Sequence, residues 1–270
     1  MVARVHLVDG TFELFRAYFA QRPDHSDRHG RPRKAVVGLI GSLLTLLDDV
    51  DEAVTHVAVA FDNPIRSFRN RLFDGYKTEE GVPADLLAQF TPAEDATAAL
   101  GVVCWSMDEW EADDALATAA HRFRDEVDQV RILTPDKDLG QCLEGTRVVQ
   151  VDRVRRKFID EAALRERRGV APASIPDLLA LVGDSADGIP GIPGFGEKTA
   201  AAVLARFEHI EAIPDDPRTW PESIRGAARL AATLAGRRAD AMLYRELATL
   251  RRDVPLAESL ADLRWSGPRT

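Results

Sequence analysis

Three short apolar runs, each closed by an aspartate, constrain the fold of this chain more than any other feature. The runs are rich in Val, Ile and Leu and span residues 4–8, 56–61 and 130–133, as buried β-strands do. Helical patterns at residues 35–49, 111–125 and 161–168 lie between or after them. Alternating strands and helices predict an α/β fold with a mostly parallel sheet flanked by helices.

The aspartates that close these runs are Asp9, Asp62 and Asp136. Parallel strands end at one edge of a sheet, where such sheets bind their ligands, so we expect the three carboxylates to lie together. Any one of them could equally be a turn former or the N-cap of the next helix. Their shared position at one edge favours a functional site.

Three further groups of acids follow the same logic. In EWEADDALATAA, Glu111 and Asp114 share one face of a predicted helix and Asp113 points aside. Acids in a first helical turn also favour the helix dipole, which would explain one or two of these three. Asp138 follows Asp136 in TPDKDLGQ, and the stretch GDSADGIPG contributes two more aspartates, with turn formation as the alternative for each pair.

Together these groups provide nine carboxylates, and so many anions can pack together only if cations neutralise them. The nine are Asp9, Asp62, Glu111, Asp113, Asp114, Asp136, Asp138, Asp184 and Asp187. Hard oxygen ligands without His or Cys indicate Mg²⁺ or Mn²⁺. Two such ions roughly 3.5–4 Å apart are typical of phosphodiester hydrolysis.

A glycine-rich stretch, GIPGFGEKTA at residues 191–200, then opens a helix. Glycines allow the backbone to approach a phosphate, and the free N–H groups of a helix start attract it. This is a helix-hairpin-helix signature; a P-loop is excluded by its glycine spacing. A simple loop with a helix cap is the alternative. The predicted DNA contacts are Gly191, Gly194, Gly196, Lys198 and Thr199.

Residues 65–92 mix bases with aromatics, Gly and Pro, and we interpret them as a mobile insertion. Basic side chains pair with phosphates and aromatics stack on unpaired bases, as single-strand recognition requires. A solvated amphipathic helix is the alternative. The predicted DNA-binding residues here are Arg66, Arg69, Arg71, Tyr76 and Lys77.

The formal charge of −9 argues against a protein coated in positive charge. The nine predicted ligands account for the whole net charge of −9, so the rest of the protein is neutral overall and can still carry basic patches. Only two cysteines occur, without metal-ligand spacing, which fits a reducing cytosol. The longest apolar stretch, residues 35–50, is shorter than the roughly 20 residues that a bilayer requires, so no membrane association is expected.

Five blocks of the sequence resemble the bacterial 5′-3′ exonuclease and flap endonuclease family, which includes the N-terminal nuclease domain of DNA polymerase I. The blocks are LVDGTFELFRAYFA, AFDNPIRSFRNRLFDGYK, EWEADDALA, ILTPDKDLGQ and LVGDSADGIPGIPGFGEKTAAAVL. The resemblance implies a PIN-like nuclease domain over residues 1–175, with a helical arch at about residues 65–92. It also implies a C-terminal helix-three-turn-helix, or helix-hairpin-helix, DNA-binding region over residues 176–270.

The resemblance also implies roles for single residues. Asp9, Asp62, Glu111 and Asp113 look like the first metal cluster, with Asp114 beside them. The second ion would be held by the set Asp136, Asp138, Asp184 and Asp187. Lys77 matches the arch lysine that contacts the scissile phosphate, and Arg16 matches a basic position after the first strand. Near Lys198, a K⁺ ion would bridge the hairpin to a DNA phosphate.

One departure from the family pattern follows Lys77. Members often continue as YKANR, whereas here Thr78, Glu79 and Glu80 follow, so the usual arginine position is acidic. This change bears on threading of a 5′ flap and on the balance between exonuclease and endonuclease activity.

The function expected from these features is a metal-dependent, structure-specific 5′ nuclease acting on DNA flaps, nicks or gaps in replication and repair. We expect a free-standing monomer in the cytoplasm, associated with the nucleoid when on DNA. One alternative is a branched-DNA-binding protein with weak or lost cleavage, and another is a PIN-type ribonuclease. Phosphatases that begin with Asp-x-Asp are excluded because Thr11 occupies the second acidic position.

Overall fold

The computed structural model describes residues 3–268, which form an α/β fold around one six-stranded sheet. The strand order is β3, β2, β1, β4, β5, β6, and every neighbouring pair is parallel except β5 and β6. The strands are β1 Arg4–Asp9, β2 His56–Asp62, β3 Val103–Met107, β4 Gln129–Leu133, β5 Val148–Asp152 and β6 Lys157–Ile159. The predicted mostly parallel sheet is confirmed, and β3, β5 and β6 are additions to the three predicted strands.

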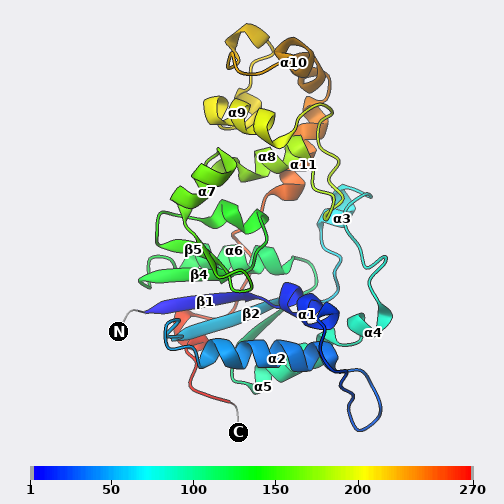
Figure 1. Ribbon diagram of the computed structural model, residues 1–270, viewed down its shortest axis with the longest axis vertical. Coiled ribbons are helices and arrows are strands. Elements are labelled where there is room, and N and C mark those ends of the chain that lie inside the picture. The colour runs from blue at the N-terminus through cyan, green and yellow to red at the C-terminus, as the bar shows by residue number, and fades with distance from the viewer. Residues whose placement is uncertain (1–2, 269–270) are drawn as a thin grey trace.

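Successive side chains of β2 enter two different cores, because they point to opposite faces of the sheet. Val57, Val59 and Phe61 pack into the core beneath α1 (Gly10–Phe19), α2 (Lys34–Leu47) and α5 (Phe90–Ala99). Ala58 and Ala60 face α6 (Ala112–Phe123). Helices therefore cover both faces of the sheet (Figure 1). No helix within residues 3–268 has both the length and the apolar character needed to cross a bilayer.

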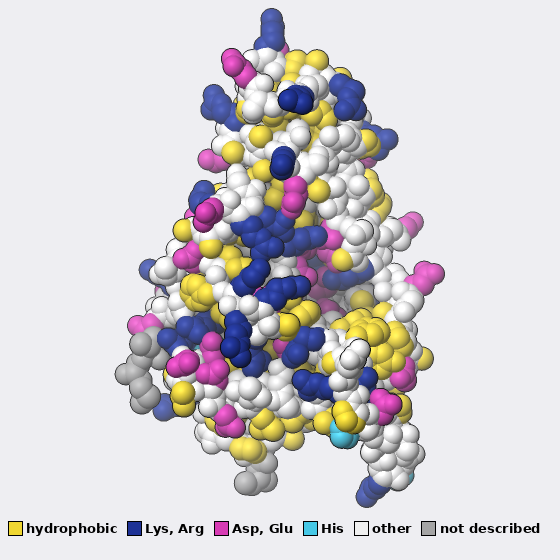
Figure 2. Space-filling model, viewed as in Figure 1, with side chains coloured by type: hydrophobic (Ala, Val, Ile, Leu, Met, Phe, Trp, Pro, Cys, Tyr) yellow, Lys and Arg dark blue, Asp and Glu magenta, His cyan; other side chains and the backbone are white. Residues whose placement is uncertain are grey.

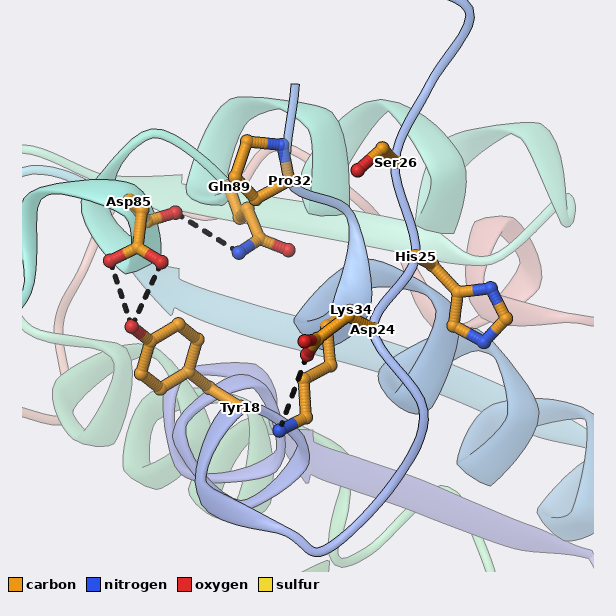
Figure 3. A pocket seen from close by; sticks show the side chains of 8 residues that line it. All are labelled: Tyr18, Asp24, His25, Ser26, Pro32, Lys34, Asp85 and Gln89. Carbon is orange, nitrogen blue, oxygen red and sulfur yellow. Dashed lines mark hydrogen bonds and ion pairs between the residues drawn. The ribbon is translucent and has the colours of Figure 1, made fainter. Parts of the chain in front are cut away.

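The segment predicted to be a helical arch contains little helix. It holds α3 (Arg69–Leu72), α4 (Ala84–Leu87) and the start of α5, while residues 73–83 form turns and bends. Phe68 and Tyr76 are buried, so the base of this segment is anchored to the body of the protein. Its far end is tied to α1, because Tyr18 Oη donates to Asp85 Oδ1 (2.8 Å; Figure 3).

The second half of the chain adds helices above the sheet (Figure 1). After α7 (Glu161–Arg168) come α8 (Ile175–Val182), α9 (Glu197–Phe207), α10 (Ala227–Gly236) and α11 (Arg238–Ala248). They enclose their own apolar core, which includes Leu178, Leu204, Leu234 and Leu247. The predicted boundary between residues 175 and 176 falls in the first turn of α8, and the division into two domains stays a prediction.

The C-terminal tail returns to the sheet after α11. Leu250, Val254, Leu256 and Leu263 are buried in the core between the sheet and α6. Trp265 fixes the end of this tail, since its Nε1 donates a hydrogen bond to the carbonyl of Leu100 (2.9 Å). Residues 250–265 therefore pack with the nuclease half, although we expected them to belong to the helical region.

Candidate active site

Asp9 ends β1 and Asp62 ends the neighbouring β2, so both lie at the same edge of the sheet, where they are 6% and 8% exposed, respectively. Asp9 is also the N-cap of α1, where its Oδ1 accepts from Phe12 N (2.8 Å). Its Oδ2 accepts from Thr134 Oγ1 (2.9 Å). Asp62 Oδ1 accepts from Ala112 N (2.7 Å) at the start of α6. Helix capping was the alternative to a role in the site for these residues, but Asp9 and Asp62 do both.

Glu111 enters the same site as the N-cap of α6. Ser67 Oγ donates to its Oε1 (2.6 Å), and Tyr76 Oη donates to its Oε2 (3.2 Å). Arg69 NH1 lies 3.2 Å from Oε1. The base of the arch segment therefore fixes the orientation of this carboxylate.

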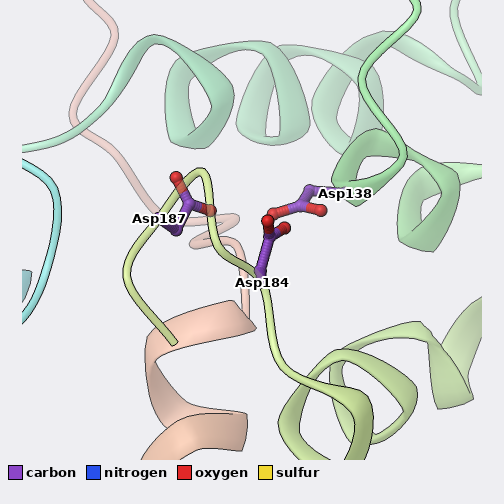
Figure 4. A group of neighbouring side chains, drawn as sticks. All are labelled: Asp138, Asp184 and Asp187. Atoms are coloured by element: carbon purple, nitrogen blue, oxygen red, sulfur yellow. The ribbon is translucent and has the colours of Figure 1, made fainter. Parts of the chain in front are cut away.

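A second set of carboxylates comes from the turn after β4 and the loop after α8. Asp138, Asp184 and Asp187 each offer an oxygen, and these oxygens all lie within 4.8 Å of one another (Figure 4). Asp184 and Ile189 exchange two backbone hydrogen bonds of 2.8 Å that close the loop carrying Asp187. Asp138 Oδ1 is buried and has no hydrogen-bond partner within residues 3–268, as expected for an oxygen that a cation would satisfy.

Lys77 joins the two sets. Its Nζ lies 2.9 Å from Glu111 Oε2 and 3.1 Å from Asp187 Oδ1. Its backbone N donates to the Asp187 carbonyl (3.0 Å). Beside it, Gly188 has a φ of +75°, and a Cβ there would lie 2.0 Å from the carbonyl oxygen of Gly75. Only glycine permits this close approach, which docks the arch base on the loop of the second set.

Mutual repulsion shows in the pKa values of the first set. Burial, with the negative charge of Asp62 added, raises the pKa of Asp9 to about 7. Burial and the charge of Glu111 raise the pKa of Asp62 to about 6, although Lys77 opposes the shift. Glu111 shows the reverse, because Lys77 and Arg69 outweigh its burial and lower its pKa to about 2. The site therefore carries more negative charge than Lys77 and Arg69 can offset.

Asp136 couples the two sets electrostatically. Burial and then the charge of Asp136 raise the pKa values of both Asp113 and Asp138 well above the usual range. Eight of the nine predicted carboxylates therefore share one site: Asp9, Asp62, Glu111, Asp113, Asp136, Asp138, Asp184 and Asp187.

Asp114 and Arg69 are instead a buried ion pair. Arg69 NH1 and NH2 donate to the two oxygens of Asp114 (2.7 and 2.8 Å), and each residue is 0% exposed. Arg69 also donates to the carbonyls of Leu247 (2.7 Å) and Thr249 (3.0 Å). Because neither side chain is free, the predictions that Asp114 binds a metal and that Arg69 binds DNA are wrong.

The other predicted arch contacts differ in accessibility. Tyr76 is 4% exposed and bonded to Glu111, so it cannot stack on an unpaired base, and that prediction is also wrong. Arg66 and Arg71 are exposed and form ion pairs with Glu79 (3.2 Å) and Glu109, respectively. Their DNA-binding role stays a prediction.

Arg16 lies outside the carboxylate site. It extends from α1 to pair with Glu13 and to donate to Ser42 Oγ of α2 (3.1 Å). Its role in catalysis stays a prediction.

The glycine-rich stretch divides into a buried and an exposed part. Gly191 is buried with a φ of +73°, and a Cβ there would lie 2.6 Å from Gly183 N, so packing against the end of α8 requires this glycine. The prediction that Gly191 contacts DNA is therefore not supported. Gly194, Gly196 and Lys198 are exposed and Thr199 is half-buried at the start of α9.

Comparison with known proteins identifies the family. The sequence model of the 5′-3′ exonuclease N-terminal resolvase-like domain matches residues 4–169, and that of the C-terminal SAM fold matches residues 170–270. The chain belongs to the 5′-3′ exonuclease family. The resemblance deduced from the five sequence blocks is confirmed.

Relatives include a 5′-3′ exonuclease of Bacillus subtilis, 33% identical over 263 residues that cover 95% of this chain and 86% of the relative. DNA polymerase I of Bacillus caldotenax is 34% identical over 273 residues, covering 99% of this chain and 30% of the polymerase. The chain thus spans less than a third of such polymerases. The T5 5′-exonuclease with bound zinc has the same fold, with a TM-score of 0.69, 18% identity, and coverage of 91% and 89% of the two chains.

Three side chains at the site were not predicted from the sequence. Lys137 Nζ pairs with Asp184 Oδ2 (2.7 Å), Thr134 orients Asp9, and Thr11 Oγ1 accepts from Asp62 N (2.8 Å). Lys137 and Thr134 belong to the TPDKD motif at the end of β4, and that position was the signal available for both.

Proposed function

We propose that this member of the 5′-3′ exonuclease family is a structure-specific nuclease that hydrolyses DNA phosphodiesters near a 5′ end. The observation that carries the proposal is the convergence of two carboxylate sets around Lys77. The proposed substrates are DNA duplexes with 5′ flaps, nicks or gaps, as arise in replication and repair. Free thiols at Cys104 and Cys142 fit work in a reducing cytoplasm.

We further propose Mg²⁺ or Mn²⁺ as the cofactor. The donor set is all oxygen. Asp138 Oδ1, beside Asp184 and Asp187, has no hydrogen-bond partner among the described residues and therefore fits a cation. The first position would be held by Asp9, Asp62, Glu111 and Asp113, and the second by Asp136, Asp138, Asp184 and Asp187. Bound divalent ions lower the pKa of water and offset the charge that develops on phosphate oxygens.

The protein's own groups would orient the DNA. The Lys77 ammonium, already held between Glu111 and Asp187, would donate hydrogen bonds to a non-bridging oxygen of the scissile phosphate. Burial by itself would lower the pKa of Lys77, but the neighbouring charges, chiefly those of Glu111, Asp187 and Asp62, together raise it well above the usual range. Lys77 therefore acts as a fixed cation rather than as an acid or base.

The exposed part of the hairpin would hold duplex DNA away from the site. Lys198 and the free N–H groups at the start of α9 are suited to a phosphate. A K⁺ ion bridging carbonyls of this turn to the DNA backbone is part of the proposal. Activity as a monomer is also part of the proposal.

Cleavage of a 5′-flap duplex in Mg²⁺ tests the proposal. The native chain should release the flap, and Asp138→Asn should abolish turnover while keeping the fold. Asp125→Asn serves as the control, since Asp125 is an exposed acid paired with Arg147 near the opposite edge of the sheet. No cleavage by the native chain, with binding retained, would favour the alternative of a branched-DNA-binding protein.

Metal binding supplies a second readout that does not depend on activity. Electron paramagnetic resonance of Mn²⁺ should count at least two ions per native chain and one fewer after Asp138→Asn. An equal count in both proteins would contradict the assignment of Asp138.

A further inference from the structure

Three arginines meet in a pocket separate from the carboxylates. Arg16 lies on α1 and Arg22 follows it, while Arg153 comes directly after the carboxyl end of β5. Ser42 and Thr45 of α2 complete the lining of an open hollow of about 470 Å³. We call this the arginine pocket.

The positive charge of the arginine pocket is only partly balanced. Arg16 NH2 and Arg153 NH1 both donate to Ser42 Oγ, each at 3.1 Å, which draws the two guanidinium groups together. Glu13 pairs with Arg16, whereas Arg22 and Arg153 have no carboxylate partner among residues 3–268. Arg16 Nε is buried, and no hydrogen-bond partner for it occurs in the described part of the chain. Like charges at this spacing repel, and an anion between them would relieve the repulsion.

The arginine pocket lies on the same edge of the sheet as the carboxylates. Asp9 ends β1 and Asp152 ends β5, and these strands flank β4 with the same direction. Arg153 follows Asp152, and Arg16 lies two helical turns beyond Asp9. Figure 2 shows Lys and Arg side chains gathered over the middle of the facing side, next to a hollow where acidic side chains are visible. A strand held at the carboxylates can therefore continue over basic surface.

We propose that the arginine pocket binds a phosphodiester group of the substrate strand other than the one being cut. Guanidinium groups match the paired oxygens of a phosphate, and the Ser42 hydroxyl can donate to it as well. The inference rests on the proposed function and adds to it a site whose role is affinity and register, not chemistry. A free phosphate or a released 5′-mononucleotide offers the same chemistry, and the experiment separates these sources.

The test is the salt dependence of 5′-flap binding, measured by fluorescence anisotropy with Ca²⁺ in place of Mg²⁺. Arg22→Gln and Arg153→Gln should each weaken binding roughly tenfold, as for a hydrogen bond to a charged group. Each should also reduce the slope of log K against log salt by about 1. Arg147→Gln is the matched control, because Arg147 precedes β5 at the opposite edge of the sheet and should change neither quantity.

A second variant guards against misfolding, since Arg153 also donates to the Ser42 carbonyl (3.2 Å). Thr45 is exposed on α2 and lines the pocket, so Thr45→Glu adds a negative charge without removing an arginine. Thr45→Glu should weaken binding, whereas the neutral Thr45→Gln should not. Equal effects of both variants would count against an electrostatic role for the pocket.

The binding and cleavage results together separate the pocket proposal from the proposed function. Suppose that the native chain cleaves the flap, and that Arg22→Gln and Arg153→Gln have the same salt slope as Arg147→Gln. This result would overturn the pocket proposal and leave the proposed function intact. Absence of both binding and cleavage in the native chain would overturn both. Calorimetry measures whether the chain binds inorganic phosphate or thymidine monophosphate. If Arg153→Gln abolishes that binding and leaves DNA binding unchanged, the pocket binds free phosphate and the proposal is contradicted.

Discussion

Lys77 Nζ lies 2.9 Å from Glu111 Oε2, although the two residues come from different segments that are joined only through tertiary packing. The contact attaches the base of the arch segment to the first carboxylate set. Lys77 also reaches Asp187 of the second set. A single ammonium group therefore bridges the two carboxylate sets.

Replacing Lys77 is expected to slow the chemical step. Lys77→Gln removes the cation between Glu111 and Asp187, and loss of one preorganised donor at a reacting group costs roughly 10²–10³-fold in rate. Single-turnover cleavage of a 5′-flap duplex at saturating enzyme measures this rate. Lys198→Gln, in the hairpin, is the comparison: it should weaken binding and leave the saturated rate nearly unchanged. A Lys77→Gln rate within twofold of native would contradict the assignment.

Stability without metal should fall as the pH rises. The pKa of Asp9 is raised to about 7 and that of Asp62 to about 6, so the folded state binds more protons than the unfolded state between about pH 4 and 7. The free energy of unfolding in EDTA must therefore decrease as the pH rises through this window. Thermal melts should show Tm falling by several degrees from pH 5.5 to 7.5.

Two controls accompany that measurement. Saturating Mg²⁺ should abolish the decline, because a bound cation keeps the carboxylates ionised at lower pH. Asp9→Asn should make the decline in EDTA shallower. A Tm in EDTA that rises over the same pH range would contradict the stated pKa shifts.

The buried pair of Arg69 and Asp114 should dominate local stability. Arg69→Met leaves Asp114 as an uncompensated buried charge, which typically costs about 3–5 kcal/mol. Arg71→Met, two residues away, breaks only an exposed ion pair with Glu109 and should change the free energy of unfolding far less. Urea unfolding of the two variants gives both values, and similar losses for both would be inconsistent with the buried network.

Glu79 should restrain DNA binding by the arch segment. Its carboxylate pairs with Arg66 at 3.2 Å, so Glu79→Gln frees an exposed arginine for phosphate. We expect several-fold tighter binding of single-stranded 5′ flaps, with little change for a nicked duplex without a flap. Glu80→Gln removes the same charge one residue away and serves as the control. Equal effects of the two changes would show that net charge alone matters, not release of Arg66.

Much of the sheet and of the site was predictable because its signals are local. The strands ending at Asp9 and Asp62 and the strand before Asp136 alternate with helices, and parallel order then brings their carboxyl ends together. The strand β5 carried a similar signal in VVQVD and was missed. Its terminal Asp152 shows the limit of the rule, since this carboxylate pairs with Arg155 (3.0 Å) and does not join the site.

The sequence by itself determined the fold class, the family, and eight of the carboxylates that share the site, because strand patterns, turn motifs and acid spacing act over a few residues. Only the tertiary structure decided which charged groups are occupied by partners. Arg69 resembles a DNA contact in sequence, yet it is buried against Asp114, 45 residues away, and against Leu247, 178 residues away. Whether a charge faces solvent, a ligand or a partner depends on packing between distant segments, and no local pattern encodes that choice.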